Sequence, residues 1–334
     1  MADSNPIETS VIIPVYNEER YIDRCIQSIK AQDYDSEKIE FIFVDGNSTD
    51  NTFEKLTEYA KDIHNFRILS NPKRTVPYAM NIGIKVSRGK YIIRLDAHAE
   101  YAPDYISKCV YYLENTDAEN VGGVAETKSH GYIGNAIALM LSSKFGVGNS
   151  RFRTNGKSGY VDTVPFGAFR REVFEKLGGY DERLTRNQDN EMNYRIRKNG
   201  GKIYLAGDIK FSYYCRDTIR GIAKMAFQNG KWNVISMKLC PGSMGVRHFI
   251  PLAFLLSLIG LPILAIISPL FYPLLLLVIS SYSILDVYFS IKEATEVRYF
   301  PLLVVLFPIF HLTYGFGSIV GIIGMLNQIK KAMS

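Results

Sequence analysis

The uneven distribution of charge along the chain constrains its fold more than any other feature. Of 334 residues, 22% are charged, and the formal net charge is +6. After residue 248 only seven residues are charged: Asp286, Lys292, Glu293, Glu296, Arg298, Lys330 and Lys331. This division excludes a single uniform soluble domain, a disordered protein and a fibrous repeat. We therefore expect a soluble N-terminal domain followed by sequence that is compatible with a membrane.

The polar part of the chain, residues 1–248, contains 35 basic and 30 acidic residues. This modest excess favours an anionic neighbour, either lipid headgroups or a phosphate-bearing ligand, and is too weak to indicate nucleic acid. The four cysteines form no CxxC pair and no metal-binding spacing, which is typical of isolated thiols in a reducing compartment. No cleavable signal peptide precedes the first apolar run, so we expect this domain to stay in the cytoplasm.

Strand and helix patterns alternate at the start of the chain. Apolar runs typical of strands occupy residues 11–15, 39–44, 66–69 and 91–95, and each of the first three is followed by apolar side chains at helical spacing. This βαβαβαβ order predicts an α/β fold with a mostly parallel central sheet, right-handed crossovers and helices on both faces.

Polar clusters begin where three of these strands end, at residues 16–19, 45–50 and 96–98. In sheets of this kind, ligands bind beyond the carboxyl ends of the strands. One such cluster is also typical of a helix cap, but three of them indicate a single shared pocket at the edge of the sheet.

The pattern becomes mixed after residue 100. We expect helices near residues 103–113 and 172–177 and from Gln188 onwards, and strands at 121–125, 202–205 and 209–215. Residues 146–159 are rich in Gly, Ser, Asn and Lys, and we expect them to form a mobile loop that orders over a ligand.

Residues 219–239 alternate apolar side chains with the basic Arg220, Lys224 and Lys231. This pattern predicts a basic amphipathic helix on a membrane surface, with a plain surface helix of the soluble domain as the alternative. We therefore divide the chain into a soluble domain of residues 1–217, an interfacial region of 218–248 and a membrane domain of 249–334.

The membrane domain begins with a long run, residues 249–290, whose only charge is Asp286. One span needs about 20 residues for a hydrocarbon core of about 30 Å, so we expect a break at Ser268 and spans near 249–268, 271–291 and 299–326. The positive-inside rule places Arg247 and the link 292–298 in the cytoplasm, but three spans then put Lys330 and Lys331 outside. The last segment is therefore either a third span or an interfacial or re-entrant helix.

Five motifs in the polar part resemble those of family 2 glycosyltransferases, in the order and approximate spacing of that family. They are SVIIPVYNE at residues 10–18, FVDGNSTDNT at 43–52, GKY followed by LDAH at 89–98, FGAFRR at 166–171 and QDNE at 188–191. The resemblance covers about residues 8–233. It implies a GT-A fold, a nucleotide-sugar donor (UDP-sugar favoured), a divalent metal (Mn²⁺ or Mg²⁺) and inversion at the anomeric carbon.

Asp96 and His98 are the candidate metal ligands. A nucleotide diphosphate leaving group carries concentrated negative charge that a divalent cation neutralises, and side chains two apart in an extended chain share a side. The family motif is Asp-x-Asp, and His98 replaces the second Asp here. Imidazole suits manganese and similar ions. The alternative is that His98 caps the loop and Asp96 alone contacts the metal or the ribose.

The resemblance assigns Pro14, Tyr16, Asn17, Glu18, Asp45 and Asp96 to the donor pocket. A helix N-cap is the alternative for Asn17. Arg74 is a candidate for contact with the diphosphate, with a solvated loop arginine as its alternative. We interpret Ser48, Thr49 and Asp50 mainly as caps and turn formers.

Asp189 is the candidate catalytic base. An inverting transfer needs one group that removes the proton of the acceptor hydroxyl, and the resemblance places this residue at the start of a helix. The family has an acidic residue before it, which Gln188 replaces. A helix N-terminus is expected to keep Asp189 ionised. The alternative is that Asp189 is only an N-cap, and Glu191 is the weaker candidate.

Gln228, Lys231 and Trp232 resemble the Gln-x-x-Arg-Trp signature of membrane polysaccharide synthases, with Lys in place of Arg. Trp232 is suited to stacking on an acceptor sugar, and Lys231 to binding diphosphate as a point charge. The alternative is a tryptophan and a lysine at the membrane surface.

These observations together predict a multi-pass protein of the cytoplasmic membrane that acts as an inverting glycosyltransferase. We expect it to use a nucleotide-sugar donor and a polyprenyl-linked or other membrane glycan acceptor at the cytoplasmic face, and to contact membrane lipids but no nucleic acid. The alternatives are a processive polysaccharide synthase and a catalytically silent membrane binding module.

Overall fold

A computed structural model of the chain describes residues 7–154 and 156–333, with side chains up to residue 327. The chain forms two compact units. We call Met1–Glu126 with Asn155–Tyr214 the sheet unit, and Thr127–Thr154 with Cys215–Ser334 the helical unit. Segment 127–154, in the middle of the polar sequence, thus belongs with the apolar C-terminal helices.

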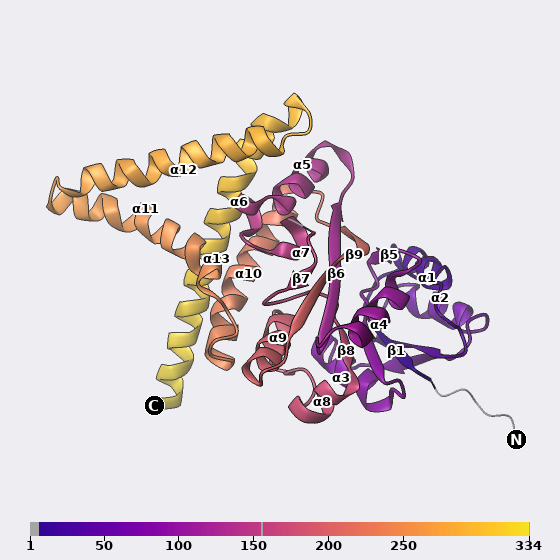
Figure 1. Cartoon of the computed structure of the whole chain (residues 1–334). Coiled ribbons are helices and arrows are strands. Elements are labelled where there is room, and N and C mark those ends of the chain that lie inside the picture. The colour runs from indigo at the N-terminus through magenta and orange to yellow at the C-terminus, as the bar shows by residue number, and fades with distance from the viewer. Residues whose placement is uncertain (1–6, 155, 334) are drawn as a thin grey trace, which may run out of the picture. The chain divides into compact units, whose positions relative to one another are not determined.

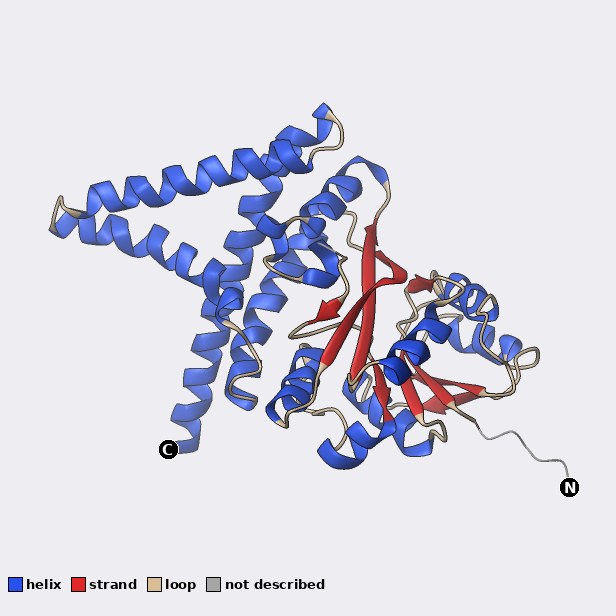
Figure 2. Ribbon diagram, in the orientation of Figure 1, coloured by secondary structure: helices blue, strands red, loops and turns tan. Residues whose placement is uncertain are grey.

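The sheet unit is built on one sheet with the strand order β3-β2-β1-β4-β8-β6-β9-β5 (Figure 2). The parallel strands are β1 (Thr9–Val15), β2 (Ile39–Asp45), β3 (Phe66–Ser70) and β4 (Tyr91–Arg94). The antiparallel pairings involve β5 (Ala99–Tyr101), β6 (Asn120–Lys128), β7 (Gly159–Tyr160), β8 (Ala168–Arg170) and β9 (Ile203–Tyr214). The expected α/β fold is confirmed, and its sheet is mixed because the later strands pair in the opposite sense.

The helices of this unit lie close to their expected positions. They are α1 (Ile22–Lys30), α2 (Thr52–Tyr59), α3 (Val76–Val86), α4 (Tyr105–Asn115), α8 (Arg171–Leu177) and α9 (Gln188–Lys198). The central strands are covered on both faces, since Val11, Ile12 and Ile13 on β1 are all fully buried. Such continuous apolar strands are typical of parallel sheets between two helical layers.

Two expectations for the middle of the chain are wrong. The runs 202–205 and 209–215 belong to one strand, β9, which continues through Gly207. The backbone of Gly156 packs closely there, and only glycine fits, because a Cβ at position 207 would lie 2.1 Å from the carbonyl oxygen of Gly156. The expected loop of residues 146–159 instead contains parts of two short helices, α6 (Lys144–Val147) and α7 (Arg151–Thr154). Residue 155 lies outside the described part of the chain.

The helical unit is assembled around α13 (Phe300–Met333). The other helices are α5 (Gly131–Ser142), α10 (Ile219–Leu239), α11 (Ile250–Ile267) and α12 (Phe271–Glu293), with short 3₁₀ turns η1 (Val246–Phe249) and η2 (Val297–Tyr299). Apolar residues of α5, α10 and α13 form a common core that includes Ile137, Ile222 and Phe307. Among the residues that the structure describes, three helical segments are long and apolar enough to cross a membrane, at the places expected from the sequence: Val246–Ile267, Phe271–Glu293 and Val297–Asn327.

A buried ion cluster joins strand β2 to its neighbours. The carboxylate of Glu40, which is fully buried, accepts hydrogen bonds from Ser10 Oγ (2.6 Å), from Arg67 (2.5 Å) and from the backbone and side chain of Arg88 (2.7 and 3.2 Å). Although burial opposes it, these hydrogen bonds and the two positive charges lower the pKa of Glu40. A buried carboxylate is tolerated here because each oxygen has strong donors.

We expect Glu40→Gln to lower the melting temperature of the protein at neutral pH. Hydrogen bonds to a charged group contribute about 1.5–3 kcal/mol each, and the amide cannot accept all four. Because the folded pKa is lowered, this stabilisation is complete above the ordinary Glu pKa of about 4.3 and is lost as the pH falls below it. Thermal unfolding followed by circular dichroism from pH 7 to pH 3 measures both effects.

The exposed Glu58 of α2 provides the control, since Glu58→Gln removes the same charge without a buried partner. A melting temperature of Glu40→Gln equal to that of Glu58→Gln at neutral pH would show that the cluster does not stabilise the sheet.

Candidate active site

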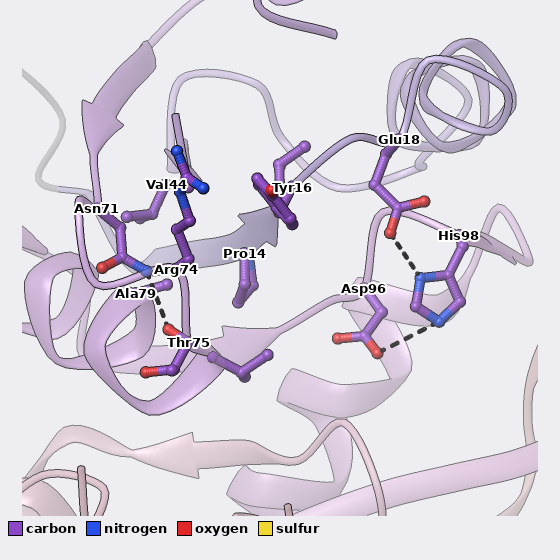
Figure 3. Close-up of a pocket in the computed structure, with 13 residues that line it drawn as sticks. Pro14, Tyr16, Glu18, Val44, Asn71, Arg74, Thr75, Ala79, Asp96 and His98 are labelled. Carbon is purple, nitrogen blue, oxygen red and sulfur yellow. Dashed lines mark hydrogen bonds and ion pairs between the residues drawn. The ribbon is translucent and has the colours of Figure 1, made fainter. Parts of the chain in front are cut away.

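A pocket with about 460 Å³ of open volume lies at the carboxyl ends of the parallel strands (Figure 3). The predicted residues that line it are Pro14, Tyr16, Glu18, Arg74, Asp96 and His98. The backbone ties the strand ends together here, because Gly46 N donates to Val15 O and Asn71 N donates to Asp45 O. The expectation of one shared pocket at this edge of the sheet is therefore met.

Tyr16 and Arg74 form one wall of the pocket. The Arg74 guanidinium lies 5.4 Å from the centroid of the Tyr16 ring, which is 40% exposed. Gly46 makes room for this ring, since a Cβ at position 46 would lie 3.1 Å from Tyr16 Cδ2. Arg74 has a positive φ of 59°, which bends the chain after Asn71 and directs the side chain to the pocket. An exposed aromatic face beside a cation is suited to stacking against a planar base and to binding phosphate.

Asp45 and Asn17 hold the loops around the pocket together. Asp45 accepts hydrogen bonds from the Ser48 hydroxyl (2.6 Å) and from Ser48 N (3.1 Å). Asn17 Oδ1 accepts from Thr49 N (2.8 Å), and Asn17 N donates to Ser48 Oγ (2.9 Å). Neither lines the pocket. Their part in donor binding stays a prediction.

Two local predictions for these loops have clear outcomes. The N-cap alternative for Asn17 is wrong, because α1 begins at Ile22 with Tyr21 as its N-cap. The interpretation of Asp50 as a turn former is confirmed, because its Oδ1 accepts hydrogen bonds from the backbone and hydroxyl of Thr52 (3.1 and 2.6 Å), whereas the N-cap of α2 is Asn51.

His98 lies between two carboxylates. Its Nδ1 is 3.1 Å from Glu18 Oε1, and its Nε2 is 3.9 Å from Asp96 Oδ2 (Figure 3). Within residues 7–154 and 156–327, no group of three or more His, Cys, Asp or Glu side chains is placed to hold a metal ion. The Asp96 and His98 donor atoms are 3.9 Å apart, wider than the roughly 3.0 Å that bonds of about 2.1 Å give at an octahedral right angle, so both reach one ion after a small side-chain movement. A nitrogen and an oxygen donor suit manganese, and diphosphate oxygens are the usual further ligands at such sites.

Arg94, the last residue of β4, connects the candidate metal ligand to the candidate base. This arginine is 3% exposed, and its guanidinium donates to Asp189 Oδ1 (2.5 Å) and to Asp96 Oδ1 (3.0 Å). Although burial opposes it, the two carboxylates raise the pKa of Arg94, which therefore stays charged. The sequence interpretation missed this residue. Its alternation with Asp96 in an otherwise apolar strand is the pattern that could have identified it.

Asp189 is the second residue of α9 and is 24% exposed at its side chain. The alternative of an N-cap role is wrong, because the N-cap is Asn187, with a positive φ of 63°. Burial raises the pKa of Asp189, although Arg94 opposes the shift. Burial therefore outweighs the expected effect of the helix N-terminus, and a raised pKa suits a proton acceptor.

The neighbours of Asp189 on α9 have other roles. Glu191 is 3% exposed and pairs with Arg195 at 2.6 Å, one turn along the same helix, which makes it structural. Gln188 is 9% exposed, and its side-chain oxygen has no hydrogen-bond partner among the described residues.

Tyr101 of β5 fixes the backbone of Asp96. Its hydroxyl accepts a hydrogen bond from Asp96 N (2.6 Å) and lies within donor distance of Asp96 O (3.2 Å). Tyr101 is 5% exposed and packs against Tyr105, with ring centroids 4.8 Å apart. This second residue missed from the sequence positions the turn that carries Asp96 and His98.

Gln228, Lys231 and Trp232 lie on α10 of the helical unit. None of them lines the pocket of the sheet unit. Their predicted part in acceptor or diphosphate binding stays a prediction.

Comparison with known proteins identifies the family. Residues 10–178 match the Glycosyl transferase family 2 domain. Over 322 residues the chain is 28% identical to "Dolichyl N-acetyl-alpha-D-glucosaminyl phosphate 3-beta-D-2,3-diacetamido-2,3-dideoxy-beta-D-glucuronosyltransferase" of Methanococcus voltae, covering 94% of this chain and 97% of that protein. It is 29% identical to "Succinoglycan biosynthesis protein ExoA" of Rhizobium meliloti (strain 1021), covering 73% and 74%.

Solved structures show the same fold. The mannosyltransferase PcManGT from Pyrobaculum calidifontis, crystallised with GDP-Man and Mn²⁺, superposes with a TM-score of 0.58 at 19% identity and covers 95% of this chain and 89% of that one. S. aureus TarS 1-349 gives a TM-score of 0.53 at 16% identity, with coverage of 93% and 90%. The expected GT-A fold is confirmed. The chain belongs to glycosyl transferase family 2, and it is a glycosyltransferase.

We expect the rate of this enzyme to fall at acid pH as Asp189 becomes protonated. The raised pKa places this decline above the ordinary Asp pKa of about 3.9. Arg94→Gln removes the charge that opposes the shift, so the acid limb of the pH–rate profile moves to higher pH, by about 1 unit or more. Initial rates from pH 5 to pH 9 measure this displacement.

Arg24→Gln is the control for this experiment, because Arg24 on α1 is exposed and interacts with Glu100 at 3.8 Å and with the Tyr214 ring at 5.7 Å, and not with Asp189. An acid limb that stays in place in Arg94→Gln would show that Asp189 does not control the proton transfer.

Proposed function

We propose that this enzyme transfers a sugar from a nucleotide diphosphate donor, with UDP-sugar favoured, to a polyprenyl-linked or other membrane glycan acceptor at the cytoplasmic face, with inversion at the anomeric carbon. The observation that carries the proposal is the link from Asp96 through Arg94 to Asp189, because it brings the leaving-group end of the pocket and a proton acceptor within the span of one guanidinium. The relatives from Methanococcus voltae and Rhizobium meliloti support a glycan acceptor through their names.

In this proposal the donor nucleoside occupies the pocket beside Tyr16. The ring is open to stacking, and Arg74 above it supplies positive charge near the diphosphate. Asp96 and His98 are the residues that would hold a divalent cation, and such an ion would supply positive charge for the departing diphosphate. Glu18 orients the His98 imidazole through its contact at Nδ1, so that Nε2 faces Asp96.

The transfer itself needs one base. Asp189 accepts the proton of the acceptor hydroxyl while the acceptor oxygen forms its bond to the anomeric carbon. The bond from that carbon to the diphosphate oxygen breaks on the opposite side, and its electron pair leaves with the nucleotide diphosphate. Arg94 keeps the Asp189 carboxylate in place and balances its charge against that of Asp96.

Asp189→Asn tests the base. The amide keeps the size and part of the contact with Arg94 but cannot accept a proton, so we expect kcat to fall by about 10²–10⁴-fold. Nucleotide-sugar binding, measured as the thermal shift caused by UDP-sugars and GDP-sugars, is expected to remain. Glu175→Gln on the exposed surface of α8 is the control. Undiminished turnover by Asp189→Asn would overturn this assignment.

A ladder of long products would favour the processive synthase over a single addition.

His98 variants test the metal. We expect His98→Ala to raise the Mn²⁺ concentration for half-maximal rate by about 10–100-fold, the effect typical of lost support at a metal site. His98→Asp restores two oxygen ligands, which suit Mg²⁺, so the ratio of Mg²⁺-supported to Mn²⁺-supported rate is expected to rise. Rates are measured against metal concentration after treatment with a chelator. If the chelated wild-type enzyme turns over unchanged, the metal proposal is wrong.

A further inference from the structure

The three apolar helical segments differ in what covers them. In Val246–Ile267 and Phe271–Glu293, 6% and 11% of the most apolar stretch is buried inside the protein, whereas in Val297–Asn327 the share is 44%. The large apolar side chains of α11 and α12 are open, with Ile259 at 50%, Ile263 at 56% and Leu276 at 66% exposed. Exposed apolar surface of this kind needs an apolar environment. For α13, neighbouring protein segments supply much of that environment.

Helices α5 and α10 cover α13. On α13, Leu303, Leu306 and Phe307 are fully buried in the core shared with these two helices. Further along, Ser318 Oγ donates to Gly230 O at 3.2 Å, and a Cβ at Gly317 would lie 2.0 Å from the carbonyl oxygen of Phe227. The backbones of α10 and α13 are therefore in close contact along the middle of α13.

Helix α10 is charged on its outer side. Arg220, Lys224 and Lys238 are exposed, and Lys231 lies beside the contact with Gly321. Several cations on one helix are not tolerated in hydrocarbon. Because α13 is packed directly against this helix, the two helices share one depth relative to a membrane.

Helices α11 and α12 have the opposite character. They run side by side away from α10 and α13 (Figure 1), and at 1.5 Å per residue their 18 and 23 residues reach about 27 and 35 Å, against a hydrocarbon core of about 30 Å. The base of this hairpin is fixed, because Gly315 contacts Pro251 and Tyr282 hydrogen-bonds to His311 at 2.9 Å.

The turn of the hairpin is built for an apolar environment. Ile266, Ile267 and Leu270 are 83%, 76% and 80% exposed at its tip. Several N–H groups of the turn are paired within it, since Ser268 N donates to Leu264 O and Phe271 N donates to Ser268 O. Pro269 has no N–H to satisfy.

The polar segments of the helical unit are strongly basic. Residues 127–154 and 215–248 hold ten Lys and Arg residues and one acidic residue, Asp217, whereas the sheet unit holds 25 basic and 29 acidic residues. The positive excess of the polar sequence thus belongs entirely to the unit that carries the hairpin. Basic segments next to a membrane-inserted element are attracted by anionic lipid headgroups.

We propose that the α11–α12 hairpin is the part of residues 7–154 and 156–333 that is inserted deeply into the bilayer, and that α13 lies with α10 at the anionic headgroup surface without crossing it. This arrangement puts Lys330 and Lys331 on the same side as Arg247, as the positive-inside rule requires.

Depth-dependent fluorescence quenching tests the proposal. The chain has one tryptophan, so Trp232→Phe gives a background in which Phe316→Trp reports α13 and Ile259→Trp reports α11. Both positions are exposed and lie near the middle of their apolar segments. In vesicles with phosphatidylglycerol, we expect the ratio of quenching by shallow to deep nitroxide lipids to exceed one for Phe316→Trp and to fall below one for Ile259→Trp. Deep quenching of Phe316→Trp would overturn the proposal.

The sidedness of the C-terminal end is an independent measurement on the full chain. An epitope tag appended after residue 334 is expected to be removed by protease in inverted membrane vesicles and to be protected in right-side-out vesicles. The reverse result would mean that α13 crosses the membrane. Transfer activity is not needed for either measurement, so failure of the proposed function would leave both results interpretable.

Discussion

The contact of Arg94 with Asp96 and Asp189 is the interaction on which the rest of the site depends. Two carboxylates in one site repel each other, and burial makes this repulsion stronger. A buried guanidinium between them, at 2.5 and 3.0 Å, balances the charge and fixes both side chains through directed hydrogen bonds. It also joins the parallel strands, through β4, to helix α9, which is encoded 95 residues later. The mixed sheet is needed because β8 brings that later chain beside β4.

The sequence allowed most of the parallel half to be predicted, because local patterns determine it. Each strand is an apolar run with a polar cluster at its end, and the sheet brings Tyr16, Arg74 and His98 to one pocket as expected. Arg94 was missed because its partner Asp189 is distant in the chain, so no local pattern connects them. Asp45 also lies at the end of a strand, but its carboxylate accepts a hydrogen bond from the Ser48 hydroxyl. This contact depends on the conformation of the loop, which the sequence does not reveal.

The antiparallel half was harder for a related reason. Strand β9 contains Gly207, and its apolar pattern is interrupted there, so the sequence indicates two strands. The strand continues because the Gly156 backbone packs against that position, and this contact joins segments 51 residues apart. The short helices α6 and α7 were likewise hidden in a Gly-rich and Ser-rich stretch. Composition is typical of a loop there, but the chain belongs to the helical unit, and Phe145 packs against the core of that unit.

Hydropathy identified three apolar helices and could not distinguish their surroundings. Hydropathy averaged over a window measures how apolar a helix is. An apolar helix is stable both against other protein segments and in lipid, so this average does not distinguish the two environments. The neighbours of each helix therefore decide its place. The apolar side chains of α11 and α12 have little protein against them, whereas α13 packs along part of its surface against α5 and the basic α10. A charged helix in direct contact is stronger evidence than hydropathy, because its own position relative to the membrane is restricted by the cost of burying its lysines. The conflict between the positive-inside rule and three spans arose from treating all apolar helices alike.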